Sequence, residues 1–411
     1  MHQRFERIND FLYYIGVNDR ETHLFENQFP IPQGVTYNSY LLTAEKTALL
    51  DTVKITKVDE FVENIESVLK GRKLDYLVIH HMEPDHSGSI RLIQKLYPEV
   101  VLVGNKLTFD ILEKFQDINL SNRIIVHEGE QLNLGDRSLT FFSTPMVHWP
   151  ESMVSIENKS GTLFSQDIFG SFAALDGVIF DDELDWSIYA KEVSRYYTNI
   201  VGYHSNMAQK AVAKLDGVKI NLICPTHGPV WRSYPEKIID LYVRLATWQV
   251  EHGVVIVYGS MYGNTASLSD KIARELSIQG ISKIRVFDVS KTDPSFILDE
   301  IWRNRGLILA SVSYHNGLYL PMQKLLLHLK DARMKNHILG YVASYSWSGG
   351  AYKELEKFAQ DFEGNQVLQG NFEFRSSPDY DDIHKGKLLA REMARKLEEK
   401  RNESAVNILK I

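Results

Sequence analysis

His81-Met82-Glu83-Pro84-Asp85-His86 is the stretch of this 411-residue chain that decides its fold. It places four potential metal ligands within six residues, directly after a β-rich segment at residues 75–80. Pro84 disfavours a helical conformation at Glu83, and in extended backbone the side chains at positions i and i+2 project to the same side. His81 and Glu83 can therefore converge on one ion, while Asp85 and His86 reach toward a neighbouring one.

Three further candidate ligands follow at long intervals: His148, Asp167 and His227, each in a loop shortly after a predicted strand. In a layered α/β fold the strand ends collect along one edge, so loop residues far apart in sequence can meet there. Seven ligands are enough for two metal ions. Any one of them alone is equally well explained as a surface loop residue, but four ligand types in this order serve no packing purpose. His80 is expected to point away from His81 as a strand residue.

The pattern of predicted strands and helices divides the chain near residue 250. Up to about residue 185, short β-rich segments such as 40–42, 48–51 and 153–156 are ended by turn formers, which indicates a two-sheet α/β layer structure. A mostly helical stretch over 186–215 follows, and one more strand at 219–224 closes this half.

From Gly253 onward, strands alternate with helices in five βα units. Such alternation predicts a parallel doubly wound sheet whose ligand lies beyond the carboxyl ends of its strands. The last strand is expected at 366–372 and the last helix at 381–400. We therefore expect one domain over residues 1–250, a second over 251–400, and a C-terminal tail at 401–411.

A phosphate-binding loop is predicted where the first of these units turns from strand to helix. Its sequence is Gly259-Ser260-Met261-Tyr262-Gly263-Asn264-Thr265. Small residues let backbone N–H groups converge, two hydroxyls can donate, and the positive end of the helix dipole favours an anion. The loop has neither the lysine of a nucleotide-binding P-loop nor a G-x-G-x-x-G pattern, so a monophosphate fits it best.

Composition excludes several classes of function. The chain is 44% hydrophobic and 24% charged, as in ordinary globular proteins. A net charge of −7 provides no global positive field for nucleic acid or anionic lipid. The single cysteine, Cys224, excludes internal disulfides and cysteine-ligated iron–sulfur clusters. Apolar runs are too short to span a bilayer, so we expect a cytoplasmic protein with no membrane or nucleic-acid partner.

The spacing of the seven candidate ligands resembles the metallo-β-lactamase superfamily, and more closely the flavodiiron proteins. Zinc hydrolases of the superfamily carry His where this chain has Glu83, and a mixed carboxylate and imidazole shell suits redox-active iron. The loops of the second half resemble the flavodoxin domain of the same family. The resemblance implies a metallo-β-lactamase-like αββα sandwich followed by a flavodoxin-like doubly wound parallel sheet.

The resemblance also implies roles for individual residues. His81, Glu83 and His148 would bind one iron, Asp85, His86 and His227 the other, and Asp167 would bridge them. His23 and Tyr197 would lie beside the metals and contribute to catalysis. FMN would be bound by three loops, and an aromatic face at Trp347 would pack against its ring. The FMN-binding residues are expected to be Ser260, Met261, Tyr262, Gly263, Asn264, Thr265, Ser311, Ser313, Tyr314, His315, Asn316, Ser344, Tyr345, Ser346, Trp347, Ser348 and Gly349.

The activity implied by the resemblance is reduction of dioxygen to water, of nitric oxide to nitrous oxide, or of both, at a diiron centre that receives electrons from FMN. The electron donor would be external: a rubredoxin, an NADH-linked reductase or a reduced deazaflavin such as coenzyme F420. Family members form head-to-tail homodimers, so a homodimer or a dimer of dimers is expected. Two alternatives remain open: a dizinc hydrolase of the thioesterase kind fused to a flavodoxin module, and a non-catalytic redox carrier or sensor.

Overall fold

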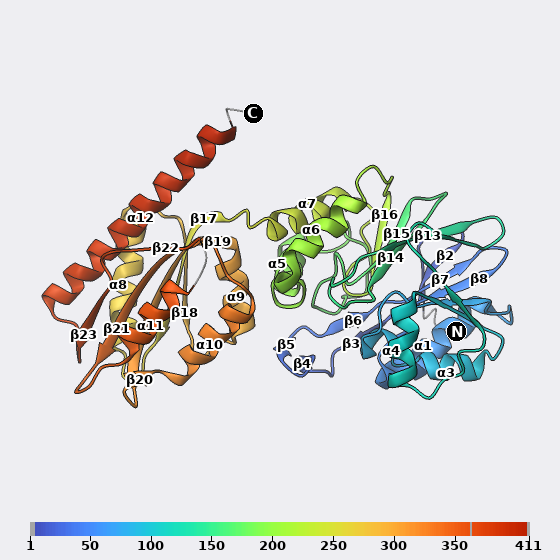
Figure 1. Ribbon diagram of the computed structural model, residues 1–411, viewed down its shortest axis with the longest axis horizontal. Helices are drawn as coiled ribbons and strands as arrows, with labels where there is room; N and C mark the ends of the chain where they lie inside the picture. The colour runs from blue at the N-terminus through green and yellow to red at the C-terminus, as the bar shows by residue number, and fades with distance from the viewer. Residues whose placement is uncertain (1–4, 362–363, 409–411) are drawn as a thin grey trace. The chain divides into compact units, whose positions relative to one another are not determined.

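The computed structural model describes residues 5–361 and 364–408, and it divides into two compact units, Met1–Thr247 and Trp248–Ile411 (Figure 1). Both units are built from sheets flanked by helices. No helix in the described ranges is both long enough and apolar enough to cross a membrane.

The N-terminal unit contains two main sheets. The first has the order β1 (Glu6–Arg7), β2 (Leu12–Tyr14), β7 (Tyr40–Thr43), β8 (Thr47–Leu50), β9 (Tyr76–Val78), β10 (Val101–Gly104) and β11 (Arg123–Ile125). The second has the order β12 (Gln131–Asn133), β13 (Ser138–Ser143), β14 (Met153–Glu157), β15 (Thr162–Gln166) and β16 (Leu222–Pro225). One hydrophobic core contains side chains from both sheets, including Leu42, Leu50, Phe141 and Phe164, so the facing sides of the two sheets are buried against each other. The expected two-sheet layer structure is confirmed.

Helices complete this unit. They are α1 (Val58–Leu69), α2 (Pro84–Ser87), α3 (Ile90–Leu96), α4 (Lys106–Phe115), α5 (Trp186–Tyr196), α6 (Ser205–Lys214) and α7 (Pro235–Ala246). Figure 1 shows α1, α3 and α4 gathered beside the first sheet, and α5, α6 and α7 nearer the second. The helical stretch expected over 186–215 is interrupted by a π-helical segment, Tyr197–Val201, and a short 3₁₀ turn, Gly202–His204.

Two small antiparallel pairs stand apart from the main sheets. β3 (Val17–Asp19) pairs with β6 (Val35–Tyr37), and β4 (Leu24–Phe25) pairs with β5 (Phe29–Pro30). The turn of the second pair holds Glu26 and Asn27 with positive φ angles of 50° and 54°. Its ring at Phe25 packs edge-on against the His227 imidazole, with 5.4 Å between centroids, so this hairpin borders the metal-ligand cluster.

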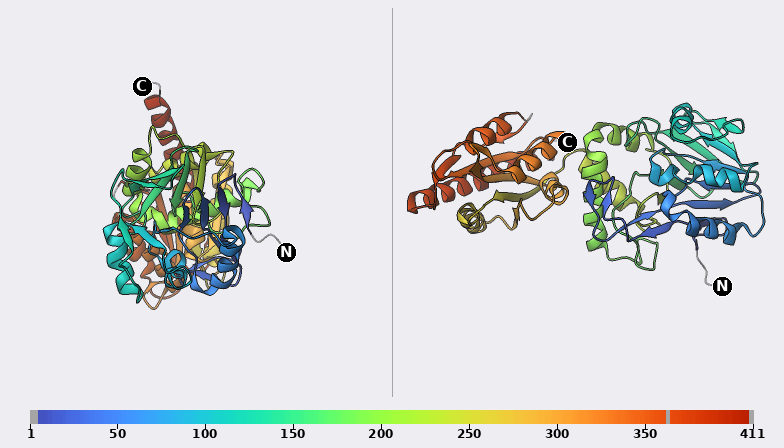
Figure 2. Two further views of the ribbon diagram at one scale, coloured as in Figure 1. Left: turned by 90° about the vertical axis from the view of Figure 1, so that its right-hand side faces the viewer. Right: turned by 90° about the horizontal axis from the view of Figure 1, so that it is seen from below.

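The C-terminal unit is a doubly wound parallel sheet, as predicted. Its strand order is β18 (Lys283–Asp288), β17 (Glu251–Gly259), β19 (Asn304–Tyr314), β21 (Ile338–Tyr345) and β22 (Gln366–Val367), while β20 (Gly317–Leu318) pairs with β19. Its helices are α8 (Asn264–Ile278), α9 (Pro294–Arg303), α10 (Leu320–Asp331), α11 (Ala351–Gln360) and α12 (Tyr380–Ile408). One core joins α8 and α12 to β17, β19 and β21, and helices lie on both sides of the sheet (Figure 2).

Two expectations for the end of the chain are wrong. The strand expected over 366–372 is divided into β22 and β23 (Phe372–Arg375), both paired with β21. Between them the Tyr341 N–H donates to the Asn371 side-chain oxygen at 2.7 Å, so a side chain replaces one bond of the ladder. Helix α12 continues through residues 401–408, which were expected as a tail, and residues 409–411 lie outside the described residues.

Candidate metal centre and flavin pocket

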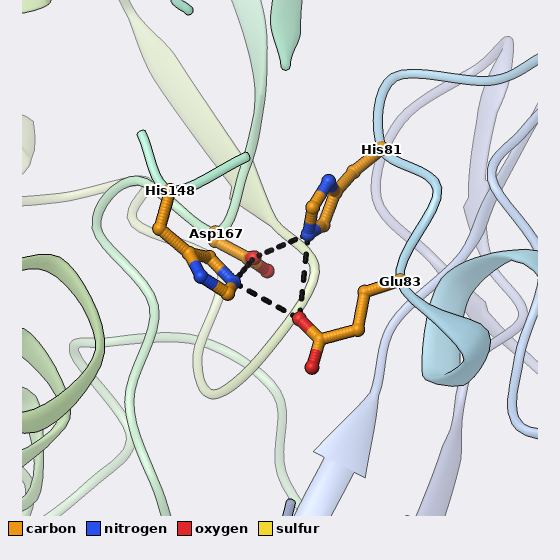
Figure 3. A group of neighbouring side chains, drawn as sticks. All are labelled: His81, Glu83, His148 and Asp167. Carbon is orange, nitrogen blue, oxygen red and sulfur yellow. Dashed lines mark hydrogen bonds and ion pairs between the residues drawn. The ribbon is translucent and has the colours of Figure 1, made fainter. Parts of the chain in front are cut away.

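The first group of candidate ligands is His81, Glu83, His148 and Asp167 (Figure 3). The His148 Nε2 atom lies 2.9 Å from Glu83 Oε2 and 3.2 Å from Asp167 Oδ2. The His81 Nε2 atom lies 3.3 Å from the same Asp167 oxygen and 3.4 Å from Glu83 Oε2. These four side chains come from the loops after β9, β13 and β15, so one edge of the sandwich collects them.

The second group is Asp85, His86 and His227. Asp85 and His86 lie on the short helix α2, which begins at Pro84 because proline is well suited to a first helical position. The His86 Nε2 atom is 3.4 Å from Asp85 Oδ1, and the His227 Nε2 atom is 3.3 Å from Asp85 Oδ2. His227 reaches this place from the loop after β16.

Asp167 joins the two groups. Its Oδ2 atom faces His81 and His148, and its Oδ1 atom lies 3.1 Å from His86 Nε2 and 3.6 Å from His227 Nε2. The Thr226 hydroxyl donates to Oδ1 at 2.8 Å and so fixes the carboxylate plane. The structure therefore brings all seven predicted side chains into one place, with one carboxylate shared between two groups.

The donor set fits a pair of metal ions. Buried polar atoms normally have hydrogen-bond partners, because leaving one unpaired is costly. Within the described residues, both Asp85 oxygens, both His86 ring nitrogens, Asp167 Oδ2 and His227 Nε2 are buried and have none. Apart from His86 Nδ1, these atoms lie within 3.4 Å of a carboxylate oxygen or an imidazole nitrogen of the same seven side chains. Four imidazoles and three carboxylates are a suitable shell for two iron ions.

Strong electrostatic coupling follows from this crowding. Burial acts to raise the pKa of Asp167, yet the imidazoles of His86 and His81 hold it well below its usual range. Burial alone would lower the pKa values of the histidines, but the negative charges of Asp85 and Asp167 raise the pKa of His86 to about 9. The nearby carboxylates of Asp167 and Glu83 likewise raise the pKa of His148, against the effect of burial, to about 10. In the metal-free protein, protonated imidazoles therefore balance the negative charges of the carboxylates in this cluster.

Two histidines are oriented by partners on their other ring nitrogen. His227 Nδ1 donates to the Thr36 carbonyl at 2.6 Å, which leaves its Nε2 facing the cluster. His81 Nδ1 donates to Glu151 Oε1 at 2.9 Å, and the Met82 N–H donates to the same oxygen at 2.8 Å. Such outer partners fix the tautomer and orientation of a metal-binding imidazole. Sequence reasoning missed Glu151, which stands in the loop three residues after His148 and gives no local signal.

The two residues predicted beside the metals, His23 and Tyr197, are not among the candidate ligands. His23 is exposed and belongs to neither group of ligands. The Tyr197 hydroxyl is bonded to Ser205 Oγ at 3.0 Å, and its ring packs on Tyr242. Its neighbour Tyr196 contacts His227 instead, with 5.6 Å between ring centroids. Tyr196, rather than Tyr197, therefore faces His227, because successive residues on a helix project about 100° apart.

Glu26 is a further residue at the edge of the cluster that the sequence did not reveal. It lies at the turn between β4 and β5, next to Phe25. Desolvation of its carboxyl group, followed by the charge of Glu83, raises the pKa of Glu26 to about 8. The edge of the cluster therefore carries an acid at Glu26, three residues after the histidine that the resemblance suggested, His23.

His80 points away from the cluster, as expected. Its Nδ1 atom is 2.7 Å from Asp51 Oδ2 and its Nε2 atom is 2.8 Å from Ser155 Oγ. All three side chains are buried. Their hydrogen bonds connect the end of β8 to β14, and all three side chains are almost inaccessible to solvent, so this triad has a structural role.

A pocket of about 410 Å³ opens at the carboxyl ends of β17, β19 and β21. Most residues predicted to bind FMN line it, together with Val312 and Ser376, which were not predicted. Gly263, Ser311 and Gly349 do not line it. Gly263 is instead the left-handed residue before α8, with φ of 89°, a conformation that favours glycine.

The three loops of this pocket are linked directly. Thr265 Oγ1 and Ser344 Oγ lie 2.9 Å apart, and the Ser348 hydroxyl donates to Asn316 Oδ1 at 2.5 Å. At Gly350 the φ angle is 148°, and a Cβ atom would lie 2.0 Å from the Asn316 carbonyl oxygen, so only glycine fits. Contacts between the loops thus shape the pocket, which lies beside a helix N-terminus suited to phosphate.

The N-terminal unit is metallo-β-lactamase-like and carries two groups of histidine and carboxylate side chains. The C-terminal unit is flavodoxin-like and has a pocket at the carboxyl ends of its strands. Together they define a class of proteins with a metallo-β-lactamase-like and a flavodoxin-like unit. The family described as ODP family beta-lactamase matches residues 35–228. A nitric oxide reductase from Moorella thermoacetica is 35% identical over 356 residues, which cover 85% of this chain and 88% of that protein.

Solved structures agree with this assignment. Rubredoxin oxygen:oxidoreductase from Desulfovibrio gigas is 30% identical, with a TM-score of 0.92 over 96% of this chain and 99% of that one. A flavo di-iron protein variant from Thermotoga maritima is 26% identical, with a TM-score of 0.86 over 96% and 98%. The chain belongs to the flavodiiron protein family.

Proposed function

We propose that this chain is an oxidoreductase that reduces dioxygen to water, nitric oxide to nitrous oxide, or both, at a diiron centre supplied with electrons by FMN. The observation that carries the proposal is Asp167, whose two oxygens face two separate groups of ligands. The similarity to a nitric oxide reductase and to a rubredoxin oxygen:oxidoreductase supports the same reaction class.

His81, Glu83 and His148 would hold one iron, Asp85, His86 and His227 the other, and Asp167 both. Bound FMN and iron supply the electron transfer that side chains cannot provide. The protein contributes orientation, because Glu151 and Thr36 fix two imidazoles and Thr226 fixes the shared carboxylate. Tyr196 holds a proton on its hydroxyl, since burial first and the charge of Asp167 second raise its pKa well above the usual value.

FMN would occupy the pocket at the ends of β17, β19 and β21, with its phosphate at the N-terminus of α8 and its ring between the loops of Tyr314 and Trp347. Electrons would come from an external donor such as a rubredoxin, an NADH-linked reductase or a reduced deazaflavin. We also propose a head-to-tail homodimer, in which a twofold axis makes two identical contacts between flavin and metal units.

Anaerobic titration of the purified, metal-analysed protein with each gas tests the proposal. The protein is loaded with FMN and iron and reduced by each donor in turn. We expect consumption of dioxygen or nitric oxide with two irons and one FMN per chain. Zinc in place of iron, with ester hydrolysis and no gas consumption, would establish the hydrolase alternative instead.

A further inference from the structure

We infer that Glu151 is a positioning residue that makes the His81, Glu83 and His148 position the more electron-rich half of the centre, so that iron held there is the harder of the two to reduce. The inference rests on the proposed diiron centre and deepens it. It concerns the inequality of the two positions, which the arrangement of ligands alone does not show.

The side chain of Glu151 is hydrogen-bonded to the loop that carries His81 and Glu83 of the first group. Its Oε1 atom accepts from His81 Nδ1 at 2.9 Å and from the Met82 N–H at 2.8 Å. The carboxylate is buried, and its Oε2 atom has no hydrogen-bond partner among the described residues. Its backbone is held as well, because the Asn105 side-chain amide donates to the Glu151 carbonyl at 2.5 Å. Because one oxygen of this buried carboxylate has no donor among the described residues, little of its negative charge is neutralised, and the His81 imidazole experiences most of that charge.

The second group has no counterpart. His227 Nδ1 donates to the Thr36 carbonyl, which is a neutral acceptor. His86 Nδ1 is buried and has no hydrogen-bond partner in the described part of the chain. An imidazole that donates to a carboxylate becomes a more basic, more anionic ligand than one that donates to a carbonyl or to nothing.

The carboxylates also place more negative charge around the first group than around the second. Asp167 is shared, so it does not distinguish the two positions. Glu83 belongs to the first group, and the carboxylate of Glu151 lies behind His81. The second group has Asp85 alone. Hard anionic surroundings stabilise the higher oxidation state of iron, so the first position should be reduced last.

The test is a redox titration of the full-length protein, loaded with FMN and two irons, followed by EPR. Glu151→Gln retains an acceptor oxygen for His81 and Met82 but removes the charge. We expect the lower of the two iron potentials to rise and the separation between the two potentials to narrow. Glu157→Gln is the matched control: it removes another buried carboxylate of the same unit, one that pairs with Arg137 and contacts neither ligand group.

The outcomes separate this inference from the proposed function. If the wild-type protein binds no iron pair, both fail. If it binds two irons and Glu151→Gln leaves both potentials unchanged, or moves the higher one more, only the inference is overturned. If Glu151→Gln loses iron, Glu151→Asp decides, because it keeps the charge: retained iron with near wild-type potentials supports the inference, and loss of iron overturns it. Outer-partner changes typically weaken metal binding about 10- to 100-fold.

Discussion

The rings of Tyr196 and His227 lie 5.6 Å apart, and the buried Tyr196 hydroxyl has no hydrogen-bond partner among the described residues. Its immediate neighbour Tyr197 is bonded to Ser205 and packs away from the metal ligands. The hydroxyl groups of two adjacent tyrosines therefore lie in different surroundings. One leaves a proton donor unpaired beside the proposed metal centre, while the other supports the packing of α7.

Replacing these tyrosines by phenylalanine separates the two roles. Tyr196→Phe removes an unpaired buried hydroxyl, so the free energy of unfolding of the metal-free protein should stay the same or rise by about 1 kcal/mol. Turnover should fall, by up to about 10²-fold, the lower end of what a positioned proton donor contributes. Tyr197→Phe should lose about 1 kcal/mol of stability and keep its turnover. Denaturant unfolding and gas-consumption assays measure both, and identical behaviour of the two variants would refute this division.

Asp167→Ala removes the carboxylate that both ligand groups share. Iron affinity should drop by more than the roughly 10- to 100-fold typical of losing an outer partner, and reductase activity should disappear. The pocket proposed for FMN lies on the other unit, so FMN content should not change. Iron analysis and the flavin absorbance of one sample give both results. Full activity with two irons bound would show that the site assignment is wrong.

Trp347→Ala tests the flavin pocket. The Trp347 side chain is 88% exposed although it lines the pocket, which is an unfavourable place for an indole without a ligand. Its loss should weaken FMN binding by about fivefold, from roughly 1 kcal/mol of aromatic stacking, and perturb the flavin spectrum while iron stays bound. Tyr380→Ala is the control, because Tyr380 is equally exposed and lies outside the pocket. Equal FMN affinity in both variants would argue against stacking.

Metal binding should release protons. In the metal-free protein the pKa of His86 is raised to about 9 and that of His148 to about 10, and His81 is raised as well. These imidazoles are therefore charged at pH 7 and must become neutral to bind metal. Calorimetric titration with Co²⁺ in buffers of different ionisation enthalpy should find about three protons released per chain. Raised histidine pKa values also mean that the metal-free fold loses stability as the pH rises from about 6.5, the ordinary pKa of histidine, toward 9 to 10. No proton release at pH 7 would contradict the coupled cluster.

His337 should make the C-terminal unit sensitive to acid. Burial lowers the pKa of this histidine from 6.5 to about 4, and its ring contacts Trp248, which stacks on Trp302 at 3.7 Å. The unfolded chain therefore binds this proton more tightly, so stability present above pH 6.5 is lost as pH falls toward 4. The loss should reach about 3 kcal/mol. Urea unfolding at pH 7 and 4.5 should show a smaller difference in His337→Gln than in wild type; an equal difference would assign the effect to other groups.

The local pattern of residues was enough to predict much of this protein. Alternating strands and helices predicted the parallel sheet of the C-terminal unit, because a βα repeat has few other ways to bury its apolar faces. The candidate ligands in the dense run from His81 to His86, and His148, Asp167 and His227, were predicted from residue type and position after strands, and the structure brings them together. The loops around Ser260, Tyr314 and Trp347 were identified in the same way, and they do line one pocket.

The sequence by itself determined which segments become strands and helices and which loops carry ligands, because these properties depend on neighbours a few residues apart. Only the tertiary structure decided that the two oxygens of Asp167 face different histidines, that Glu151 supports His81, and that Tyr196 rather than Tyr197 contacts His227. Those relationships join loops from separate strands, and the π-helical segment after Tyr196 alters the helical repeat. Distances of this kind arise from how two sheets pack, and no spacing along the chain encodes them.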